Sequence, residues 1–387
     1  MQKKDIPSRL LFGSFVFAAI SLFLFSYTQV DLNLTLSRVS IFQTIEKSFQ
    51  YIGYFKRPLA TSLYVGILGV FYILYWYILH EIHKGKISEK FLWKIIIFIS
   101  LILLFSYPAF SYDFFNYMFT AKTVLVYHKN PYEVIPLQFS GIEPWLTFMR
   151  WTHLPSAYTP LWILMTLPAY LFGFGFFLLT LFNIKILVIG FYLLTVWAIG
   201  KILEIEDEKR KILGMAIFAL NPLIIIESLV SSHNDIVMMG FAMTSIVLYM
   251  QQKKLRSFLL LAASVALKLM TIFLIPVYFL RWNRLYAFIA ILVGFLFVCS
   301  QREVLPWYWV WVMPFVALLP KRKNITIIAT FVSLGLLLRY APYLYYGHWD
   351  APVPTIKFWV TLMPVVVSLC FLLIFRLKDR RSKITSN

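Results

Sequence analysis

Long apolar runs separated by short polar stretches make up almost the whole chain. The runs lie near residues 10–27, 59–80, 93–110, 160–174, 176–200, 212–229, 236–250, 256–281, 285–300, 306–319, 325–341 and 358–376. Several are long enough to cross the hydrocarbon layer of a bilayer, which takes ~20 apolar residues in a helix. The pattern therefore predicts one all-α domain over 1–387, a polytopic transmembrane helical bundle of about 11–13 membrane segments, some of them short or re-entrant.

Lysines and arginines gather in clusters between these runs, and such clusters usually mark cytoplasmic loops. The clusters are Lys3/Lys4/Arg9, Lys84/Lys86/Lys90, Lys209/Arg210/Lys211, Lys253/Lys254/Arg256, Arg281/Arg284, Lys321/Arg322/Lys323 and Arg376/Lys378/Arg380/Arg381. All of them can be cytoplasmic only if residues 160–174 do not cross the membrane and residues 256–281 divide into two short helices at Lys268. In the alternative, 160–174 and 176–200 both cross and 256–281 is one span, which puts basic residues outside. The first run is expected to be a retained helix, because no small-x-small cleavage site follows it.

Composition narrows the class of protein. The chain is 60% hydrophobic and 14% charged, and its mean hydropathy is +0.77. A soluble fold cannot bury that much apolar surface, so a multi-pass protein of the cell membrane is expected. The net charge of +19 is explained by the orienting clusters, and no nucleic-acid partner is predicted. Cys299 and Cys370 both lie in apolar runs, so neither a disulfide framework nor a cysteine metal site is predicted.

The longest polar interruption, residues 111–158, is predicted to be a structured outer loop that carries the chemistry. Ser111 is a suitable N-cap, and Asp113 then falls in the first turn of a helix. At 100° per residue the helix is amphipathic and suited to the membrane interface. Its polar face comprises Asp113, Asn116, Tyr117, Thr120, Thr123 and Tyr127. The turn Asn130-Pro131-Tyr132 ends this helix.

The order of short motifs in this region resembles that of a known superfamily. S-x-D-x-x-x-Y at 111–117 is followed by "TAK" at 120–122, "NPY" at 130–132 and "HLPSAYTPLW" at 153–162. "NPLIIIESLVSSHND" at 221–235 and "ALKLMTIFLIP" at 266–276 come later. Together they resemble the GT-C integral-membrane glycosyltransferases, and most closely the polyprenol-phosphate-mannose-dependent α-mannosyltransferases. Two departures are Thr159, where the family usually has glycine, and two full spans before the acid.

The resemblance implies transfer of a hexose, with mannose expected, from a polyprenyl-phosphate donor to a glycan or glycolipid acceptor on the outer face. Direct displacement would invert the anomeric centre, and Asp113 would be the catalytic base that accepts the acceptor's proton. Because Asp113 lies at the end of a span, it stands where a lipid-borne sugar meets an aqueous acceptor. The alternative function is a membrane transporter or a lipid-linked glycan flippase, in which polar groups would extend through the midplane of the bilayer.

The leaving phosphate needs cations, and three are candidates: Lys122, Lys268 and Arg302. Each also has a structural explanation. Lys122 lies on the opposite side of its helix from Asp113 and is suited to snorkelling at the interface, as is Lys268 at a helix turn. Arg302 adjoins Glu303 and could form a surface pair with it.

The remaining candidates would bind the sugars. His233, Asn234 and Asp235, with Glu227 nearby, could contact sugar hydroxyls, although Asn234 or Asp235 could instead cap the helix beginning at Ile236. The other predicted substrate-binding residues are Asn116, Tyr117, Asn130, Tyr132, His153 and Tyr158. No cofactor is predicted; a divalent cation is left open, although one loop supplies few hard ligands for it.

Overall fold

A computed structural model of the chain describes residues 8–385, with side chains described to residue 374. Within these residues the regular structure is helical and contains no strand, which confirms the predicted all-α class. Six of the described helices are long and apolar enough to cross a membrane, and a seventh span is possible if one bent pair of helices is counted as one. The predicted cluster at Lys3 and Lys4 lies outside the described residues.

The N-terminal part of the bundle contains three long helices and one helix at their end. The elements are α1 (Ser8–Ser26), η1 (Tyr27–Gln29), α2 (Ser40–Phe55), α3 (Arg57–His83) and α4 (Glu89–Leu104). α1 packs against α3 and α4 through buried aliphatic and aromatic side chains. The Ser88 hydroxyl accepts from Phe91 N at 3.2 Å and so fixes the start of α4.

The predicted outer loop folds as a separate lobe. The loop contains α5 (Asp113–Leu125) and two 3₁₀ turns, η2 (Pro136–Phe139) and η3 (Pro144–Phe148), and α6 (Pro160–Leu171) follows it and completes the lobe. α6 is about 18 Å long at 1.5 Å per residue, too short to cross the ~30 Å hydrocarbon layer. The chain then turns back, and the next helix packs against α6. Asn183 Nδ2 of that helix donates to Ala169 O of α6 at 3.1 Å. This hairpin agrees with the predicted re-entrant segment.

The centre of the molecule is a long helix packed against a bent pair. The elements are α7 (Phe177–Glu206), η4 (Glu208–Arg210), α8 (Lys211–Ala219), α9 (Pro222–Ile225), the π-helical turn η5 (Ile226–Val230) and α10 (Asp235–Met250). Pro222 interrupts the helix, and the two halves meet at 57°. Every residue from 213 to 240 is buried. The polar groups within this stretch must therefore find partners inside the protein.

The C-terminal part adds short helices and two long ones. The elements are α11 (Lys254–Leu267), η6 (Leu269–Leu274), α12 (Ile275–Phe279), α13 (Arg284–Gln301), η7 (Pro306–Trp311), α14 (Met313–Ala317), α15 (Lys323–Leu338), α16 (Tyr340–Tyr346) and α17 (Val353–Thr385). The run 256–281 breaks at Lys268, whose backbone is extended at φ −159°. Tyr278 OH donates to Lys254 O at 2.9 Å, so the second half returns to the start of the first, as predicted.

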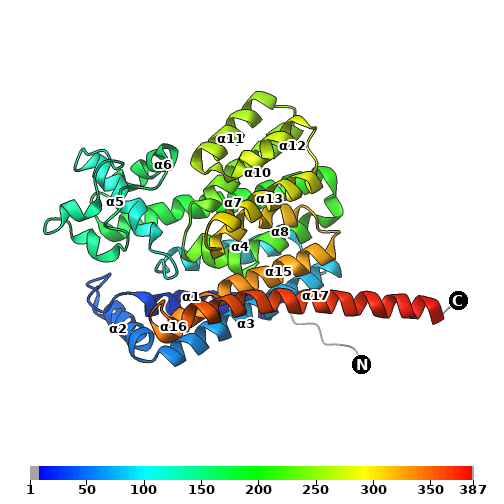
Figure 1. The fold of residues 1–387 in the computed structure, drawn as a ribbon, viewed down its shortest axis with the longest axis horizontal. Helices are drawn as coiled ribbons and strands as arrows, with labels where there is room; N and C mark the ends of the chain where they lie inside the picture. Colours follow the sequence, from blue (N-terminus) through cyan, green and yellow to red (C-terminus); the bar gives the residue numbers. More distant parts are fainter. Residues whose placement is uncertain (1–7, 386–387) are drawn as a thin grey trace.

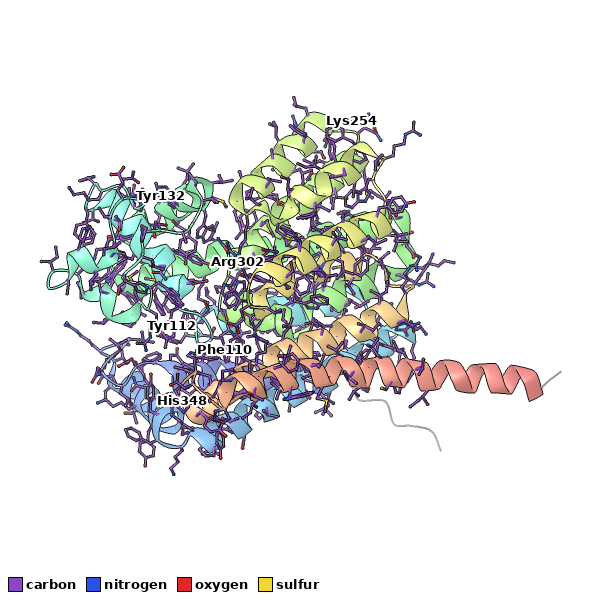
Figure 2. The ribbon with its side chains drawn as sticks, viewed as in Figure 1. Phe110, Tyr112, Tyr132, Lys254, Arg302 and His348 are labelled. Atoms are coloured by element: carbon purple, nitrogen blue, oxygen red, sulfur yellow. The ribbon has the colours of Figure 1, made fainter. Side chains whose placement is uncertain are left out.

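The predicted outer and cytoplasmic segments separate to opposite ends. α2, α5, α6 and α16 lie at one end of the molecule, and α17 extends away from it at the other (Figure 1). Tyr132 and His348 from two predicted outer loops lie at the first end (Figure 2). Ion pairs join the basic clusters elsewhere: Lys211 to Glu89 at 3.0 Å, Lys321 to Asp207 at 3.2 Å, and Arg284 to Glu206.

A lysine that the sequence analysis did not consider stabilises the central packing. Lys185 in α7 is completely buried, and its Nζ donates to Leu103 O at 2.8 Å and to Ser106 O and Oγ at 2.7 Å. These are carbonyls at the end of α4, which lack helical partners. The lysine thus acts as a C-terminal cap on α4 and fixes the point where the chain enters the outer lobe.

The first prediction concerns topology. In a Cys299→Ser/Cys370→Ser background, single cysteines at Lys90 and Glu208 should resist an impermeant thiol reagent in intact cells and react after permeabilisation. A cysteine at the exposed Ser140 of the outer lobe serves as the accessible control. Labelling at Glu208 but not at Lys90 would mean that 160–174 crosses the membrane, contrary to the hairpin.

Candidate active site

Asp113 stands at the first position of α5, close to where the chain leaves the bundle. Ser111 Oγ accepts from Asp113 N at 3.3 Å, but the residue that caps the helix is Tyr112, so the predicted Ser111 N-cap is wrong by one position. The Asp113 side chain keeps 26% of its surface exposed. The helix dipole stabilises a carboxylate in the first turn. This stabilisation does not require a hydrogen bond to the carboxylate, so the Asp113 oxygens can make other contacts.

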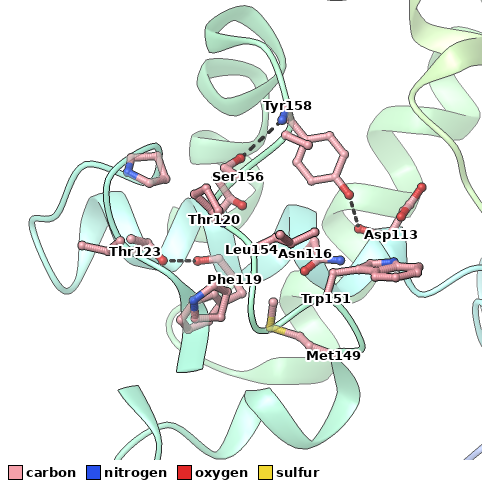
Figure 3. A pocket seen from close by; sticks show the side chains of 15 residues that line it. Asp113, Asn116, Phe119, Thr120, Thr123, Met149, Trp151, Leu154, Ser156 and Tyr158 are labelled. Carbon is pink, nitrogen blue, oxygen red and sulfur yellow. Dashed lines mark hydrogen bonds between the residues drawn. The ribbon is translucent and has the colours of Figure 1, made fainter. Parts of the chain in front are cut away.

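A cavity of about 270 Å³ runs along the polar face of α5 from Asp113 (Figure 3). Asp113, Asn116, Thr120 and Thr123 line one side, as the predicted helical face requires. Residues from 131–136 and 149–158 form the other side, with Trp151 and Tyr158 among them. Hydroxyl, amide, aromatic and aliphatic groups make up the lining together with one carboxylate, and no lysine or arginine lines the cavity. Such a lining suits a neutral sugar better than an anion.

Tyr158 closes the cavity beside Asp113. Its hydroxyl lies 3.4 Å from Asp113 O (Figure 3), and its ring packs edge-on against Tyr117 with centroids 4.7 Å apart. Tyr117 also packs on Trp162 and is buried, so it supports the wall and does not line the cavity. α5 as a whole is covered by the chain's own side chains. The helix predicted for the interface is thus enclosed by protein on most of its faces.

The turn between η5 and α10 lies against Asp113. His233 Nδ1 is 3.9 Å from Asp113 Oδ2. α10 begins at Asp235 with Asn234 as N-cap, and neither side chain makes a capping hydrogen bond. The predicted alternative of a side-chain cap is therefore wrong. Asp235 instead accepts from Lys268 Nζ at 2.7 Å and from Trp311 Nε1 at 2.5 Å.

Lys268 lies at the break between α11 and η6, with 32% of its side chain exposed. Its ammonium forms the ion pair with Asp235 and lies 5.7 Å from the centre of the Trp311 ring. One residue earlier, Leu267 O accepts from Thr159 Oγ1 at 3.0 Å. The outer lobe and the broken helix are thus joined directly beside the candidate site.

Glu227 completes the polar cluster from the inside of the bundle. Its side chain is fully buried; Oε1 accepts from Tyr340 OH at 3.0 Å, and Oε2 lies 3.4 Å from His233 Nε2. The His233 ring stacks on Trp307 with centroids 4.2 Å apart. Trp307, Trp311 and Tyr340 were missed by the sequence analysis. The run "PWYWVW" at 306–311 was the available signal, and it was taken only as an apolar segment.

Burial controls the charge state of the two central groups. It raises the pKa of the Asp113 carboxyl to about 6; Lys268 and the Tyr158 hydroxyl lower that pKa, and Asp235 raises it further. Burial also lowers the pKa of His233 to about 3, against the charge of Asp235, so the imidazole is neutral at pH 7. A carboxylate with a raised pKa is a stronger proton acceptor than an ordinary one and is still ionised at pH 7.

Two of the three candidate cations are separated from the cavity by their partners. Lys122 Nζ pairs with Glu143 at 2.7 Å and lies 4.2 Å from the Trp145 ring centre, on the side of α5 away from Asp113. It therefore faces protein and not lipid. Lys268 is held by Asp235.

Arg302 is the candidate cation for which the described side chains form no ion pair. Its side chain is exposed and its charge acts on Tyr308, whose ring stacks on Trp311 with centroids 4.5 Å apart. The predicted pair with Glu303 does not form, because Glu303 pairs with Arg339 at 2.7 Å and with Lys357. The stacked rings of Tyr308 and Trp311 therefore lie between Arg302 and the Asp235–Lys268 ion pair.

The remaining predicted residues shape the loop. Asn130 Nδ2 donates to Glu133 at 2.7 Å, and Tyr132 OH donates to Tyr158 O at 2.7 Å, so both residues hold the turn that positions Tyr158. His153 is exposed, with its ring 6.5 Å from Trp151, outside the residues that line the cavity. Among the described residues no group of three or more His, Cys, Asp or Glu side chains is arranged to hold a metal ion.

Comparison with known proteins places the chain in a family. A family model described as alpha-(1->6)-mannopyranosyltransferase, N-terminal domain, matches residues 16–284, a range that includes Asp113, the 231–235 turn and Lys268. Neither the curated proteins nor the solved structures gave a match. Because the model matches more than half of the chain, the protein belongs to this family of alpha-mannosyltransferases, MptA_B, and its apolar helices make it a membrane member.

Proposed function

We propose that the protein transfers mannose from a polyprenyl-phosphate donor to a hydroxyl of a glycan or glycolipid, at the outer face of the cell membrane and with inversion at the anomeric carbon. The observation that carries the proposal is the position of Asp113. Its carboxylate lies between a cavity without lysine or arginine and the lysine at the helix break, Lys268. An acceptor sugar and a phosphate-bearing donor need these two environments.

The reaction follows from this arrangement. The acceptor hydroxyl loses its proton to Asp113 as its oxygen bonds to the anomeric carbon of the donor. The bond from that carbon to the phosphate oxygen breaks, and its electron pair leaves with the phosphate. A base contributes ~10²–10⁴-fold to such a step. A β-linked donor would give an α-linked product, in agreement with the family's name.

Cations beside the leaving phosphate stabilise its growing charge. Arg302 is the better candidate because Lys268 is already paired with Asp235. The positive charge of Lys268 acts on Asp113 and lowers the pKa of its carboxyl. Transport would need polar groups distributed through the midplane of the bilayer. The gathering of Asp113, His233 and Lys268 at one site instead supports an enzyme.

The first test of this proposal is Asp113→Asn. The substitution keeps the side chain's shape and removes the basic oxygen, so transfer from polyprenyl-phosphate-mannose should fall by ~10²-fold or more. Stability should not fall: because burial raises the pKa of the Asp113 carboxyl, its ionisation costs folding free energy that grows from about pH 4 and is complete above about pH 6, and the amide removes that cost. Transfer rate and Tm are measured on the same purified protein.

The matched control is Asp350→Asn, which changes an exposed carboxylate whose side chain is 93% accessible in another outer loop. It should leave both rate and Tm unchanged. Near-normal transfer by a folded Asp113→Asn protein would remove Asp113 as the base.

The pH dependence follows from the raised pKa of Asp113. The base must be ionised, so kcat/KM should fall tenfold per pH unit below about 6 and level off above it. The residual activity of Asp113→Asn should lack this acid limb. An acid limb centred near pH 4, the ordinary range of an aspartate, would show that the site is not desolvated as the structure indicates.

The phosphate site is tested by two cation substitutions. Arg302→Met should raise the donor KM by ~10-fold or more without a change in Tm, since a charge-assisted hydrogen bond contributes about 1.5–3 kcal/mol. Lys268→Met should lower Tm, because it leaves the buried Asp235 carboxylate without its cation. Arg38→Met, at an exposed arginine near α2, is the control for a general loss of outer-face charge. An unchanged donor KM in Arg302→Met would place the phosphate elsewhere.

A further inference from the structure

Glu227 is a charged side chain for which the proposed transfer gives no task. It belongs to the bent helix pair, it is fully buried, and its described partners are hydroxyl and imidazole groups and no cation. An ionisable group inside a membrane protein is expensive to bury and is usually retained for a function. One carboxylate oxygen has a full hydrogen bond from Tyr340, whereas Oε2 has none and faces His233.

His233 lies between this carboxylate and Asp113. Nε2 is 3.4 Å from Glu227 Oε2, and Nδ1 on the opposite side of the ring is 3.9 Å from Asp113 Oδ2. Both separations are longer than a good hydrogen bond. Catalytic hydrogen bonds often have this length before substrate binds and shorten in the reacting complex. The order Asp113, His233, Glu227, Tyr340 is a continuous polar path from the cavity into the bundle.

Several features of the backbone and packing fix the imidazole in this place. Ser232 adopts a left-handed conformation with φ 55°, and His233 N donates to Glu227 O at 3.0 Å. The preceding turn, η5, is π-helical, a form that is concentrated at functional sites. Trp307 stacks on the ring at 20° between planes. The left-handed backbone of Ser232, the π-helical turn η5 and the stacked Trp307 ring together hold the His233 imidazole beside the two carboxylates.

We propose that His233 and Glu227 form a hydrogen-bond relay behind Asp113, one that stabilises the protonated Asp113 carboxyl without taking the proton from it. The inference rests on the proposed function, in which Asp113 is the base. Glu227 accepts from His233 Nε2–H and thereby leaves the Nδ1 lone pair facing Asp113. When Asp113 has taken the acceptor's proton, its carboxyl keeps that proton and donates a hydrogen bond to His233 Nδ1, because the pKa of His233 lies below that of Asp113. Glu227 holds the imidazole in the tautomer that can accept this bond. No electrons are transferred, and the proton leaves from Asp113 to the cavity when the products leave.

The other groups around His233 agree with this tautomer. Asp235 and Lys268 lie close by and largely compensate each other through their ion pair. Tyr117 and Tyr158 face Asp113, and Tyr340 faces Glu227; their hydroxyls remain protonated because burial raises the pKa of Tyr117 and Tyr158 well above the usual range. The neutral state of His233 at pH 7 leaves one ring nitrogen free to accept. His233 and Glu227 are therefore positioning residues that act through Asp113.

The kinetic experiment uses two variants with different effects on packing. His233→Phe keeps a ring on Trp307 and removes both nitrogens, and Glu227→Gln keeps the shape of the side chain and removes its charge. Each should lower kcat by ~10-fold or more with the donor KM within twofold. In His233→Phe the acid limb should move down by about one pH unit, because protonated Asp113 loses its hydrogen-bond acceptor.

The double variant separates a relay from a structural role. If His233 acts only through Asp113, then Asp113→Asn/His233→Phe should be no slower than Asp113→Asn alone. Additive losses would overturn the relay, and so would Glu227→Gln with normal kcat. Tm of every variant is measured with the rates, and Asp350→Asn, at an exposed carboxylate of another outer loop, is again the matched control.

Nuclear magnetic resonance of [¹⁵N]histidine-labelled protein tests the relay without any transfer reaction. The six histidines make assignment by loss of the His233 signal in His233→Phe practical. The relay requires a neutral His233 with its proton on Nε2, and a shift of that signal in Glu227→Gln. A proton on Nδ1 would overturn it. Failure of the wild-type protein to use polyprenyl-phosphate-mannose would refute the proposed function, and the resonance data would still decide the arrangement of His233 and Glu227.

Discussion

A carboxylate with no solvent contact must be compensated inside the protein, and Asp235 meets this requirement through Lys268 and Trp311. The rest of the site depends on that contact. It joins the start of α10 to the break between α11 and η6 and so fixes the 231–235 turn. Thr159 bonds to the residue before Lys268, which brings the outer lobe to the same place. Asp113 and His233, far apart in sequence, face each other as a result.

Local signals in the sequence were sufficient for some parts of this arrangement. The first turn of α5 at Asp113, the break at Lys268 and the short hairpin at 160–174 each follow from spacing, charge or proline and glycine content. Contacts between distant segments were not predictable in this way. The pairing of Lys122 with Glu143, and of Glu303 with Arg339, depends on how loops return to helices. The run that contains Trp307 and Trp311 is only a weak signal for a site, since aromatics are common in membrane spans and at interfaces.

The balance of charge at the site departs from what stability alone would favour. Three acids, Asp113, Glu227 and Asp235, lie near one paired lysine. Burial raises the pKa of Asp113, so its ionised form is destabilising at pH 7. A fold selected only for stability would replace such groups with apolar ones or pair them. Functional sites are where such local conflicts are retained.

The location of Asp113 explains how one carboxylate can serve substrates of opposite character. A polyprenyl chain remains in the bilayer, and a glycan remains in water, so the two meet only at the end of the spans. The cavity beside α5 has hydroxyl, aromatic and aliphatic walls, whereas Lys268 lies toward the bundle. A carboxylate base between these regions must be desolvated enough for its pKa to rise, and exposed enough to contact the acceptor hydroxyl. A side chain 26% exposed, with a pKa of about 6, meets both conditions. Desolvation strengthens the base, and an imidazole behind the carboxylate can accept a hydrogen bond from its protonated form.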